Sequence, residues 1–357
     1  MPLVIDTITF LIQCLKKWMN GDDVDNRDDV ENGGYVDNGD QELEFRDIFD
    51  AVINLYREFE RIKAGGNGNV QLRNTCRLRL NEMKRVYGYD LPNASARIDY
   101  SDIYTQWSYM YVYMLRHIHL VSYALDETVG NGILTDPEAS HSPTVCMIGG
   151  GPGTDVLGLS VHLRKYGHKT PLSSGVYVLD KYTKWQTGWD WLHMFLPKRY
   201  QDGIPQVNYR GFDFKNNELS VEQQQILKKA NIVTMIKSLS PVAAWLKERP
   251  KLFKFVIGPT GRPTSTVYEW HSVFSILKHM KKGAFLLYID NRTGPQRKIL
   301  MEAVDCFNFD KLYDKVLTDQ RMPTSIFSPK ANQFKREINY NPCTIAGINE
   351  VILVRKK

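Results

Sequence analysis

The sequence has little cysteine, and its cysteines follow no pairing pattern. The 357 residues include five cysteines, none spaced as C-x-x-C: Cys14, Cys76, Cys146, Cys306 and Cys343. Such a scattered, odd set excludes a disulfide framework and a structural zinc site as the basis of the fold. We therefore expect no metal centre and a reducing compartment, either the cytoplasm or the nucleus.

Long hydrophobic runs are also lacking. No run reaches the roughly 20 apolar residues that a membrane-spanning helix needs, so we expect no membrane partner. The N-terminal stretch 3–19 is apolar, but it contains Asp6 and ends near Lys16 and Lys17, without a small-residue cleavage site. It predicts an amphipathic helix within residues 1–20 rather than a signal peptide.

Acidic residues are concentrated in one short segment. Residues 21–41 hold eight acids and one arginine, which predicts a disordered loop because there is no apolar surface to bury. An EF-hand loop starting at Asp29 fits poorly, since Gly33 and Asp40 occupy its fifth and twelfth positions. This loop carries −7 and the chain +6, so the remainder carries +13. That balance permits an anionic partner such as nucleic acid, and equally a solvated basic surface.

A glycine-rich run is the most informative motif. Residues 144–148 are mostly apolar and β-branched, and a turn with Gly149, Gly151 and Gly153 leads from them into a helix-compatible stretch, 154–163. This predicts a buried strand, a tight turn and a helix capped by Thr154. The arrangement is typical of a cradle for an adenosine-containing cofactor. The spacing is G-x-G-x-G and not the dinucleotide pattern G-x-G-x-x-G.

Two further strand-like segments end in a carboxylate. Residues 175–180 end at Asp180, and residues 207–213 end at Asp213. An acid at the end of the second strand of a nucleotide-binding α/β unit accepts hydrogen bonds from ribose hydroxyls. Either acid alone also fits as an ordinary surface residue at a strand end. The remaining strand-like segments are 232–236, 284–290, 311–317 and 351–354.

The glycine-rich run resembles motif I of the class I S-adenosylmethionine (SAM)-dependent methyltransferases, and the order of the strand-like segments agrees with it. The resemblance implies an α/β fold, a seven-stranded doubly wound sheet with an antiparallel closing pair, behind a helical N-terminal region. It implies SAM as the cofactor, with its methionine part cradled by Gly149, Gly150, Gly151 and Gly153. Asp155 would approach the cofactor's ammonium group and Asp180 its ribose. Phe212 would pack near the adenine ring, and Asp213 would face the adenine amino group.

The substrate region departs from well-known patterns of this family. Residues 231–241 follow the fourth strand, where the family usually presents the acceptor, yet they contain neither D/N-P-P-Y/F nor P-C. Methylation of adenine or glutamine amide nitrogen and of pyrimidine carbon is therefore disfavoured. Lys237 and Ser238 are the candidate catalytic residues; Lys237 would orient a substrate oxygen or phosphate, or be a solvated lysine at a strand end. Residues 252–265 predict a loop suited to a lid, with a short strand at 253–257.

The sequence thus predicts a SAM-dependent methyltransferase acting on a nitrogen or oxygen of an unidentified acceptor. Two alternatives stay open. One is an RNA methyltransferase, which the basic balance permits. The other is a SAM-binding sensor or scaffold without catalysis, which is favoured by Met147 standing where the family commonly has an acid. Helical periodicity over 42–63, 74–87 and 100–125 predicts a helical cap over 42–143, followed by the SAM-binding domain over 144–357.

Overall fold

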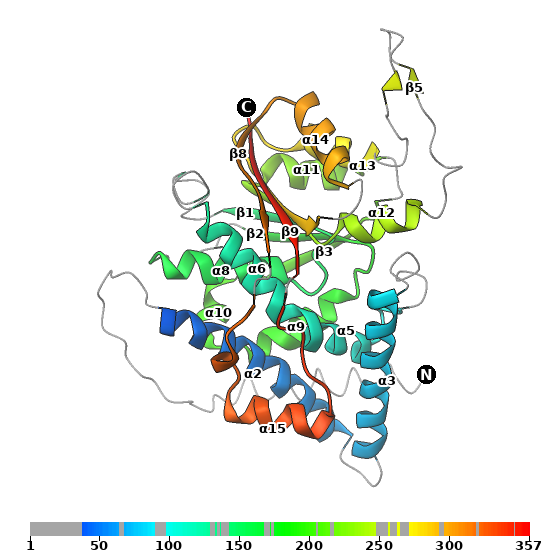
Figure 1. Cartoon of the computed structure of the whole chain (residues 1–357), viewed down its shortest axis with the longest axis vertical. Coiled ribbons are helices and arrows are strands. Elements are labelled where there is room, and N and C mark those ends of the chain that lie inside the picture. The colour runs from blue at the N-terminus through cyan, green and yellow to red at the C-terminus, as the bar shows by residue number, and fades with distance from the viewer. Residues whose placement is uncertain are drawn as a thin grey trace.

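A seven-stranded sheet forms the centre of the computed structural model (Figure 1). The described residues are 38–357 except 64–67, 90–97, 129–132, 134–135, 137–142, 168–171, 173–174, 205, 215–217, 248–255, 258–262, 265–270, 293–295, 319–320 and 346. The predicted helix within 1–20 and most of the predicted loop 21–41 lie outside them. The loop prediction was wrong at its end, because residues 38–41 are already helical.

The number and the directions of the strands in the main sheet are those predicted. In spatial order the strands are β3 (Val207–Gly211), β2 (Gly175–Asp180), β1 (Thr144–Ile148), β4 (Ile232–Ile236), β7 (Phe285–Asn291), β9 (Asn349–Lys356) and β8 (Phe309–Leu317). The first five run parallel, and β9 runs antiparallel to β7 and β8. The seven-stranded doubly wound sheet with its antiparallel closing pair is therefore confirmed.

Burial explains why the central strands read as apolar runs. All five residues of β4 are buried, as expected for a parallel strand covered by helices on both faces. The edge strand β8 is largely exposed, and its charged residues discourage pairing with another chain. A separate two-stranded sheet joins β5 (Val256–Ile257) and β6 (Pro263–Thr264). The short strand expected near 253–257 thus exists outside the main sheet, and most of the expected lid lies outside the described residues.

Helices cover the two faces of the sheet with two separate apolar cores. One face carries α8 (Thr154–Lys165), α9 (Trp185–Phe195) and α10 (Lys198–Gly203). The other carries α11 (Val221–Lys229), α12 (Leu239–Lys247), α13 (His271–His279) and α14 (Gln296–Cys306). Figure 1 shows the second group above the sheet and the first below it.

The N-terminal helices share a core with the first face of the sheet. They are α2 (Asn38–Ile62), α3 (Gly68–Tyr89), α5 (Ile103–Tyr109) and α6 (Leu115–Asp126), and their apolar side chains belong to the same cluster as those of β1 and α8. One close approach is at Gly158 of α8, where an added Cβ would lie 2.6 Å from Val121 Cβ of α6. The predicted helical segments are therefore confirmed, and they do not form a core of their own.

A segment from the far end of the chain joins this helical region. The connection between β8 and β9 carries α15 (Pro329–Ile338), which lies beside α2 (Figure 1). The Phe334 ring lies 5.0 Å from the Tyr56 ring, and Arg57 Nη2 contacts Glu337 Oε2 at 2.5 Å. The sequence predicts a SAM-binding domain over 144–357 with the helical cap before it, whereas α15 packs among the helices of the cap.

A π-helical turn joins α5 to α6. Residues Met110–Met114 form this turn (η2), so that the chain runs as one helix from Ile103 to Asp126. A π turn holds one residue more than an α turn and is often found at functional sites. It lets Trp107 face α2, where its indole Nε1 donates to the Val52 carbonyl at 3.0 Å, while Val121 faces α8.

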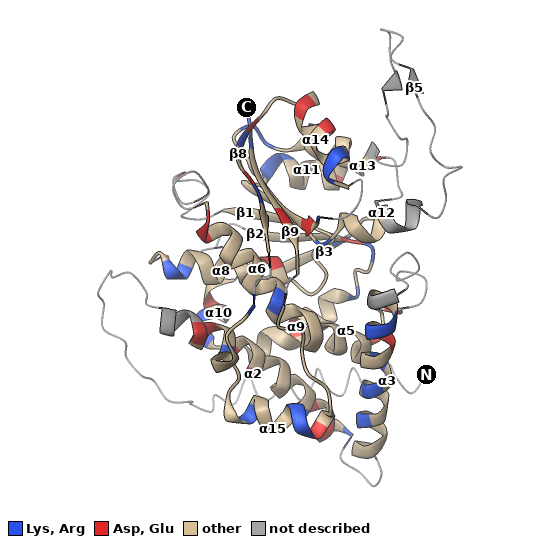
Figure 2. Cartoon of the chain, in the orientation of Figure 1, with Lys and Arg blue, Asp and Glu red and all other residues tan. Residues whose placement is uncertain are grey.

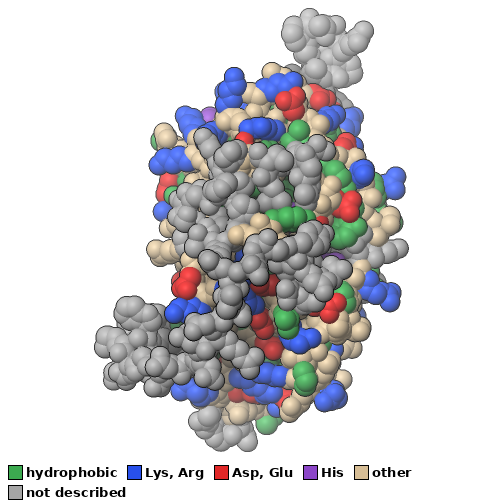
Figure 3. All heavy atoms as spheres, turned by 90° about the vertical axis from the view of Figure 1, so that its left-hand side faces the viewer, with side chains coloured by type: hydrophobic (Ala, Val, Ile, Leu, Met, Phe, Trp, Pro, Cys, Tyr) green, Lys and Arg blue, Asp and Glu red, His purple; other side chains and the backbone are tan. Residues whose placement is uncertain are grey.

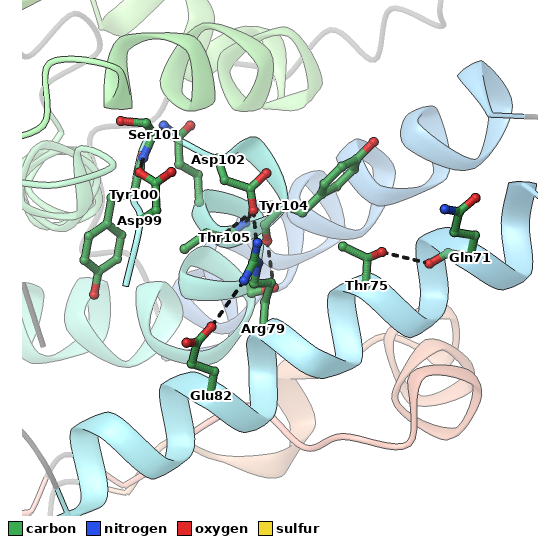
Figure 4. A network of polar contacts seen from close by, with 12 residues as sticks. Gln71, Thr75, Arg79, Glu82, Asp99, Tyr100, Ser101, Asp102, Tyr104 and Thr105 are labelled. Atoms are coloured by element: carbon green, nitrogen blue, oxygen red, sulfur yellow. Dashed lines mark hydrogen bonds and ion pairs between the residues drawn. The ribbon is translucent and has the colours of Figure 1, made fainter. Parts of the chain in front are cut away.

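Polar contacts fix α3 against the start of α5 (Figure 4). Asp102 caps α5 by accepting from the Thr105 backbone N–H at 3.1 Å, which satisfies a donor that the first helical turn leaves open. Arg79 of α3 donates to the same carboxylate at 3.2 Å and to Glu82 at 3.3 Å. These contacts hold the C-terminal half of α3 next to the α5–η2–α6 helix.

Candidate functional site

The glycine loop after β1 has the backbone that its sequence predicts. Gly149, Gly151 and Gly153 have φ values of 66°, 48° and 79°, in the left-handed region that favours glycine. An added Cβ at Gly153 would lie 2.7 Å from the Trp189 ring, whereas at Gly151 the nearest atom would be in Trp185 at 3.9 Å. Gly153 thus packs against α9, and the space beside Gly151 is open. Thr154 does not cap α8 as expected: it is the first helical residue, after Gly153 as N-cap.

Asp180 is tied to the glycine loop at the end of β2. Its carboxylate accepts from the backbone N–H groups of Gly151 at 3.0 Å and Tyr182 at 2.8 Å. Burial raises the pKa of Asp180 from its usual value, against the lowering effect of these two donors. Each carboxylate oxygen has a second lone pair for a ligand hydroxyl. Asp180 is therefore held in place and can still accept further hydrogen bonds.

The two residues expected near the adenine follow β3. The backbone N–H of Phe212 donates to the Asp180 carbonyl at 2.9 Å, and the Phe212 ring packs edge-on against Phe214 at 4.9 Å. Asp213 lies 3.8 Å from Lys181 Nζ and is only partly buried. The structure thus brings the glycine loop, Asp180, Phe212 and Asp213 together at the carboxyl ends of β1, β2 and β3, where open α/β sheets bind their ligands.

Asp155 is wholly buried between α8 and β4. Its carboxylate accepts from Thr234 Oγ1 at 2.5 Å and from Thr154 Oγ1 at 3.1 Å. Burial raises the pKa of Asp155 to about 7, although these hydroxyls lower it. The contacts observed here join α8 to the sheet, and the expected approach of Asp155 to a cofactor ammonium stays a prediction.

The buried carboxyl of Asp155 should make stability depend on pH. The folded protein keeps its proton up to about pH 7, whereas an unfolded aspartate releases it near pH 4. The folded state thus binds more protons in this window, and this residue lowers stability as the pH rises through it. Asp155→Asn should therefore raise the Tm at pH 8 by roughly 5–10 °C relative to its effect at pH 4. Equal shifts at both pH values in thermal denaturation would contradict this assignment.

Lys237 and Ser238 lie directly after β4, beside the glycine loop. Lys237 has a φ of 55°, and its Nζ donates to Asn291 Oδ1 at 2.6 Å and to Asn349. Burial lowers the pKa of Lys237 to about 8. An added Cβ at Gly149 would lie 2.8 Å from Ser238 Cβ. Ser238 Oγ is buried and has no hydrogen-bond partner in the part of the chain that the structure describes.

A cavity of about 930 Å³ opens next to these residues. Its sheet side is formed by Lys237, Ser240 and Pro241 after β4, and by Asn291 at the end of β7. Its other walls come from α3, the α5–η2–α6 helix, α15 and the residues that follow α15. We call it the basic cavity, because Lys84, Arg116, Lys237, Lys335 and Arg336 line it and no aspartate or glutamate is among its described lining residues.

The basic cavity neighbours the glycine loop without including it. Gly149–Gly153, Asp180 and Asp213 are not among its lining residues. The connection runs through Tyr109, which lines the cavity and whose ring lies 5.5 Å from Trp185, the residue nearest the open side of Gly151. The glycine loop and the basic cavity thus adjoin each other at β1 and β4. The order of the strands in the sheet reverses between these two strands.

Sequence reasoning missed most of this cavity. Tyr109, Tyr113, Arg116 and His117 share one face of the α5–η2–α6 helix, and their spacing of four, three and one was a signal present in the sequence. Lys335 and Arg336 are more than 200 residues further along the chain, and nothing in the sequence links them to that face. Only Lys237 was singled out in advance.

Comparisons with known proteins found resemblance at the level of structure. No protein-family model and no curated protein matches this chain. Among solved structures it is similar to magnesium protoporphyrin IX methyltransferase from Synechocystis, with 10% identity over 79% of this chain and 97% of that one and a TM-score of 0.38. It is also similar to an N-methyltransferase from Bradyrhizobium japonicum, with 10% identity over 70% and 91% of the two chains and a TM-score of 0.35.

Two further findings concern metal binding and membrane-spanning helices. The described residues include no group of three or more histidine, cysteine, aspartate and glutamate side chains placed to hold a metal ion. No helix within the described ranges is long and apolar enough to cross a membrane. The parallel strands β1, β2, β3, β4 and β7 and the antiparallel β8–β9 pair match what the motif resemblance implied. The chain therefore has the fold of the class I SAM-dependent methyltransferases.

Proposed function

We propose that this protein is a SAM-dependent methyltransferase that transfers a methyl group to a nitrogen or oxygen of an acceptor held in the basic cavity. The observation that carries the proposal is the meeting of two sites at one edge of the sheet. The glycine loop with Asp180 forms one, and the cavity beginning at Lys237 forms the other. Fold alone does not establish activity, so the proposal depends on this geometry.

The residues at the first site fit an adenosine-containing cofactor. The backbone beside Gly151 is open, with Trp185 as its nearest neighbour. Asp180, buried and fixed by two N–H donors, would accept from the ribose hydroxyls. Ser238 Oγ, buried without a partner in the described residues, would gain one from the methionine part. The glycine loop supplies left-handed backbone where a side chain would crowd the ligand.

The chemistry needs placement more than it needs a catalytic group. Bound SAM supplies an electrophilic methyl group on a sulfonium sulfur. The chain must hold the acceptor atom in line with that methyl group and exclude water. Lys237 is placed to orient an acceptor oxygen, because its ammonium has three donors and two are given to Asn291 and Asn349. A neutral fraction of Lys237, present because its pKa is lowered to about 8, can accept the proton that the acceptor releases.

Cofactor binding tests the first half of the proposal. Isothermal titration should show binding of SAM or S-adenosylhomocysteine and no comparable binding of NAD. Asp180→Ala should weaken SAM binding by roughly 10- to 100-fold, since a charged acceptor of ribose hydrogen bonds contributes about 1.5–3 kcal/mol. Asp314→Ala, a change in an exposed ion pair on β8, is the matched control and should leave it unchanged. Tight NAD binding without a SAM signal would overturn the assignment.

A further inference from the structure

Within the described part of the chain, the cations of the basic cavity form no ion pair with a carboxylate. The described ion pairs include nine arginines, Arg57 and Arg199 among them. None of these ion pairs involves a cation of the basic cavity. On the face shown in Figure 3, the coloured basic and acidic side chains are interspersed. The cavity differs, because only basic residues line it among the described residues; Asp290 and Glu350, which lie behind the lining, offset part of the Lys237 charge.

Arg116 is held by several contacts, and its Nη1 donates to Cys343 Sγ at 3.2 Å and to the Ile345 carbonyl at 3.5 Å. Its guanidinium lies 5.1 Å from the centre of the Tyr113 ring, and its Nη2 lies 3.0 Å from His117 Nε2. Arginine can only donate, so Nε2 of His117 must accept. Burial, with Arg116 and Lys237 nearby, lowers the pKa of His117 well below its usual range and keeps it neutral. Arg116 Nε is buried and has no partner within the described chain, so this fork has donor capacity left for a ligand.

The other cations converge on the same space from separate elements. Lys84 comes from α3, and Lys335 and Arg336 come from the last turn of α15. Lys84 and Arg336 are exposed at the rim; Figure 2 shows basic residues along α3 and α15. Burial lowers the pKa of Lys335, and the neighbouring Arg336 charge lowers it further; the Lys335 ammonium lies 3.8 Å from the centre of the Phe327 ring. Five converging charges cost free energy unless an anion with several negative charges offsets them.

Aromatic faces accompany the charge. Four tyrosines line the basic cavity: Tyr87, Tyr109, Tyr113 and Tyr340. The rings of Tyr87, Tyr109 and Tyr113 pack on one another, with Tyr109 and Tyr113 centred 5.3 Å apart. Aromatic rings beside basic groups are the combination that holds a nucleotide, since a base stacks on the ring while its phosphate meets the cation. A simple dicarboxylate would use the charges and leave the rings without a function.

We infer that the basic cavity binds a phosphorylated nucleotide, free or within a nucleic acid chain, as the methyl acceptor. The methyl-transfer step in this inference rests on the proposed function. The binding of the nucleotide rests on the cavity alone. Arg116 would form the bidentate contact that its planar fork allows with phosphate. Lys335 and Arg336 would neutralise neighbouring phosphate charge, and Lys237 would hold the end nearest the glycine loop. Methyl transfer then forms the acceptor–methyl bond and breaks the methyl–sulfur bond, whose electron pair stays on sulfur. The acceptor atom releases one proton.

Binding of defined polyanions tests this inference without an acceptor being known. The full chain, saturated with S-adenosylhomocysteine, would be titrated with tripolyphosphate, citrate, uridine triphosphate and a 5′-phosphorylated ten-nucleotide RNA. We expect the phosphate probes to bind at least about tenfold more tightly than citrate. RNA binding tighter than uridine triphosphate identifies a nucleic acid as the source, and the reverse order a free nucleotide. Citrate binding as tightly as the phosphates, or no probe binding, overturns the inference.

Rim variants show whether the cavity is the binding site. Arg336→Gln and Lys84→Gln change exposed side chains and should each weaken RNA or tripolyphosphate binding about three- to tenfold. Each should also lower the slope of log affinity against log salt by about one. Arg116→Gln should cost more than about tenfold. Arg61→Gln, an exposed arginine paired with Glu58 on α2, should change neither quantity, and unchanged binding in the rim variants would place the anion elsewhere.

Cofactor titrations on the same samples separate the two proposals. If phosphate probes bind and SAM does not, the cavity assignment stands and the proposed methyltransferase function fails. If SAM binds and no phosphate probe does, the function stands and this inference fails. Thermal denaturation of each variant shows whether a loss of binding reflects a loss of folding.

Discussion

Replacing Lys237 by methionine should reduce methyl transfer at least about a hundredfold and leave SAM affinity within about threefold of the original. Methionine keeps most of the length of the lysine and loses the donor that would orient the acceptor. The cofactor contacts proposed for Asp180 and the glycine loop lie on β1 and β2, so they should persist. An effect confined to transfer is what a residue on the acceptor side of the site would produce.

The measurement is release of S-adenosylhomocysteine from SAM incubated with cellular RNA, protein and metabolite fractions. Lys298→Met, which changes an exposed lysine of α14 paired with Glu302, is the matched control and should behave as the unmodified chain. Strong SAM binding with no turnover on any fraction would favour the sensor alternative instead. A loss of SAM affinity equal to the loss of transfer would place Lys237 in the cofactor site.

Gly158→Ala should destabilise the protein by about 2–4 kcal/mol, despite alanine's better helix propensity. The added Cβ would lie 2.6 Å from Val121 Cβ and 2.9 Å from the Ile118 carbonyl oxygen. Both distances are shorter than carbon atoms tolerate, so α6 and α8 must separate and open the core that they share. For a chain of this size we expect the Tm to fall by roughly 3–5 °C.

A second substitution distinguishes this clash from a general intolerance of α8. Val121→Ala removes the nearest methyl groups and should recover part of the loss when it is combined with Gly158→Ala. The backbone carbonyl of Ile118 stays in place, so recovery should be incomplete. Strictly additive destabilisation in the double variant would show that the two residues do not compete for the same space.

The sheet could be predicted from the sequence because each of its strands can be recognised from a short stretch of residues. The strands that end at Ile148 and Asp180 are short apolar runs bounded by turn residues, and the glycine spacing identified the loop between them and the helices. Parallel strands then bring their carboxyl ends to one edge whatever the rest of the chain does. The cofactor-side residues therefore lie together as the order of the segments implied.

The basic cavity could not be predicted in this way, because it depends on packing between distant segments. The direction in which α15 crosses from the sheet to α2 is set by contacts such as that of Arg57 with Glu337. Nothing in the sequence around either residue indicates that the two are in contact. Asp155 is a smaller example: its hydrogen bond with Thr234 in the interior could not be predicted from its place after the glycines. Burial of this kind is decided by the neighbouring strand.

The π turn at Met110–Met114 lies within the long helix that crosses the protein. The number of residues in this helix therefore decides which neighbour each of its side chains faces. Successive residues of an α-helix are rotated by about 100°. Deleting one residue within the turn would thus leave Trp107 against α2 only by swinging Arg116 and Val121 a quarter-turn or more around the axis. The cation at the cavity and the valine against α8 would move together. Insertions and deletions there would be tolerated far less than substitutions, and the cavity and the core must change in step as the sequence diverges.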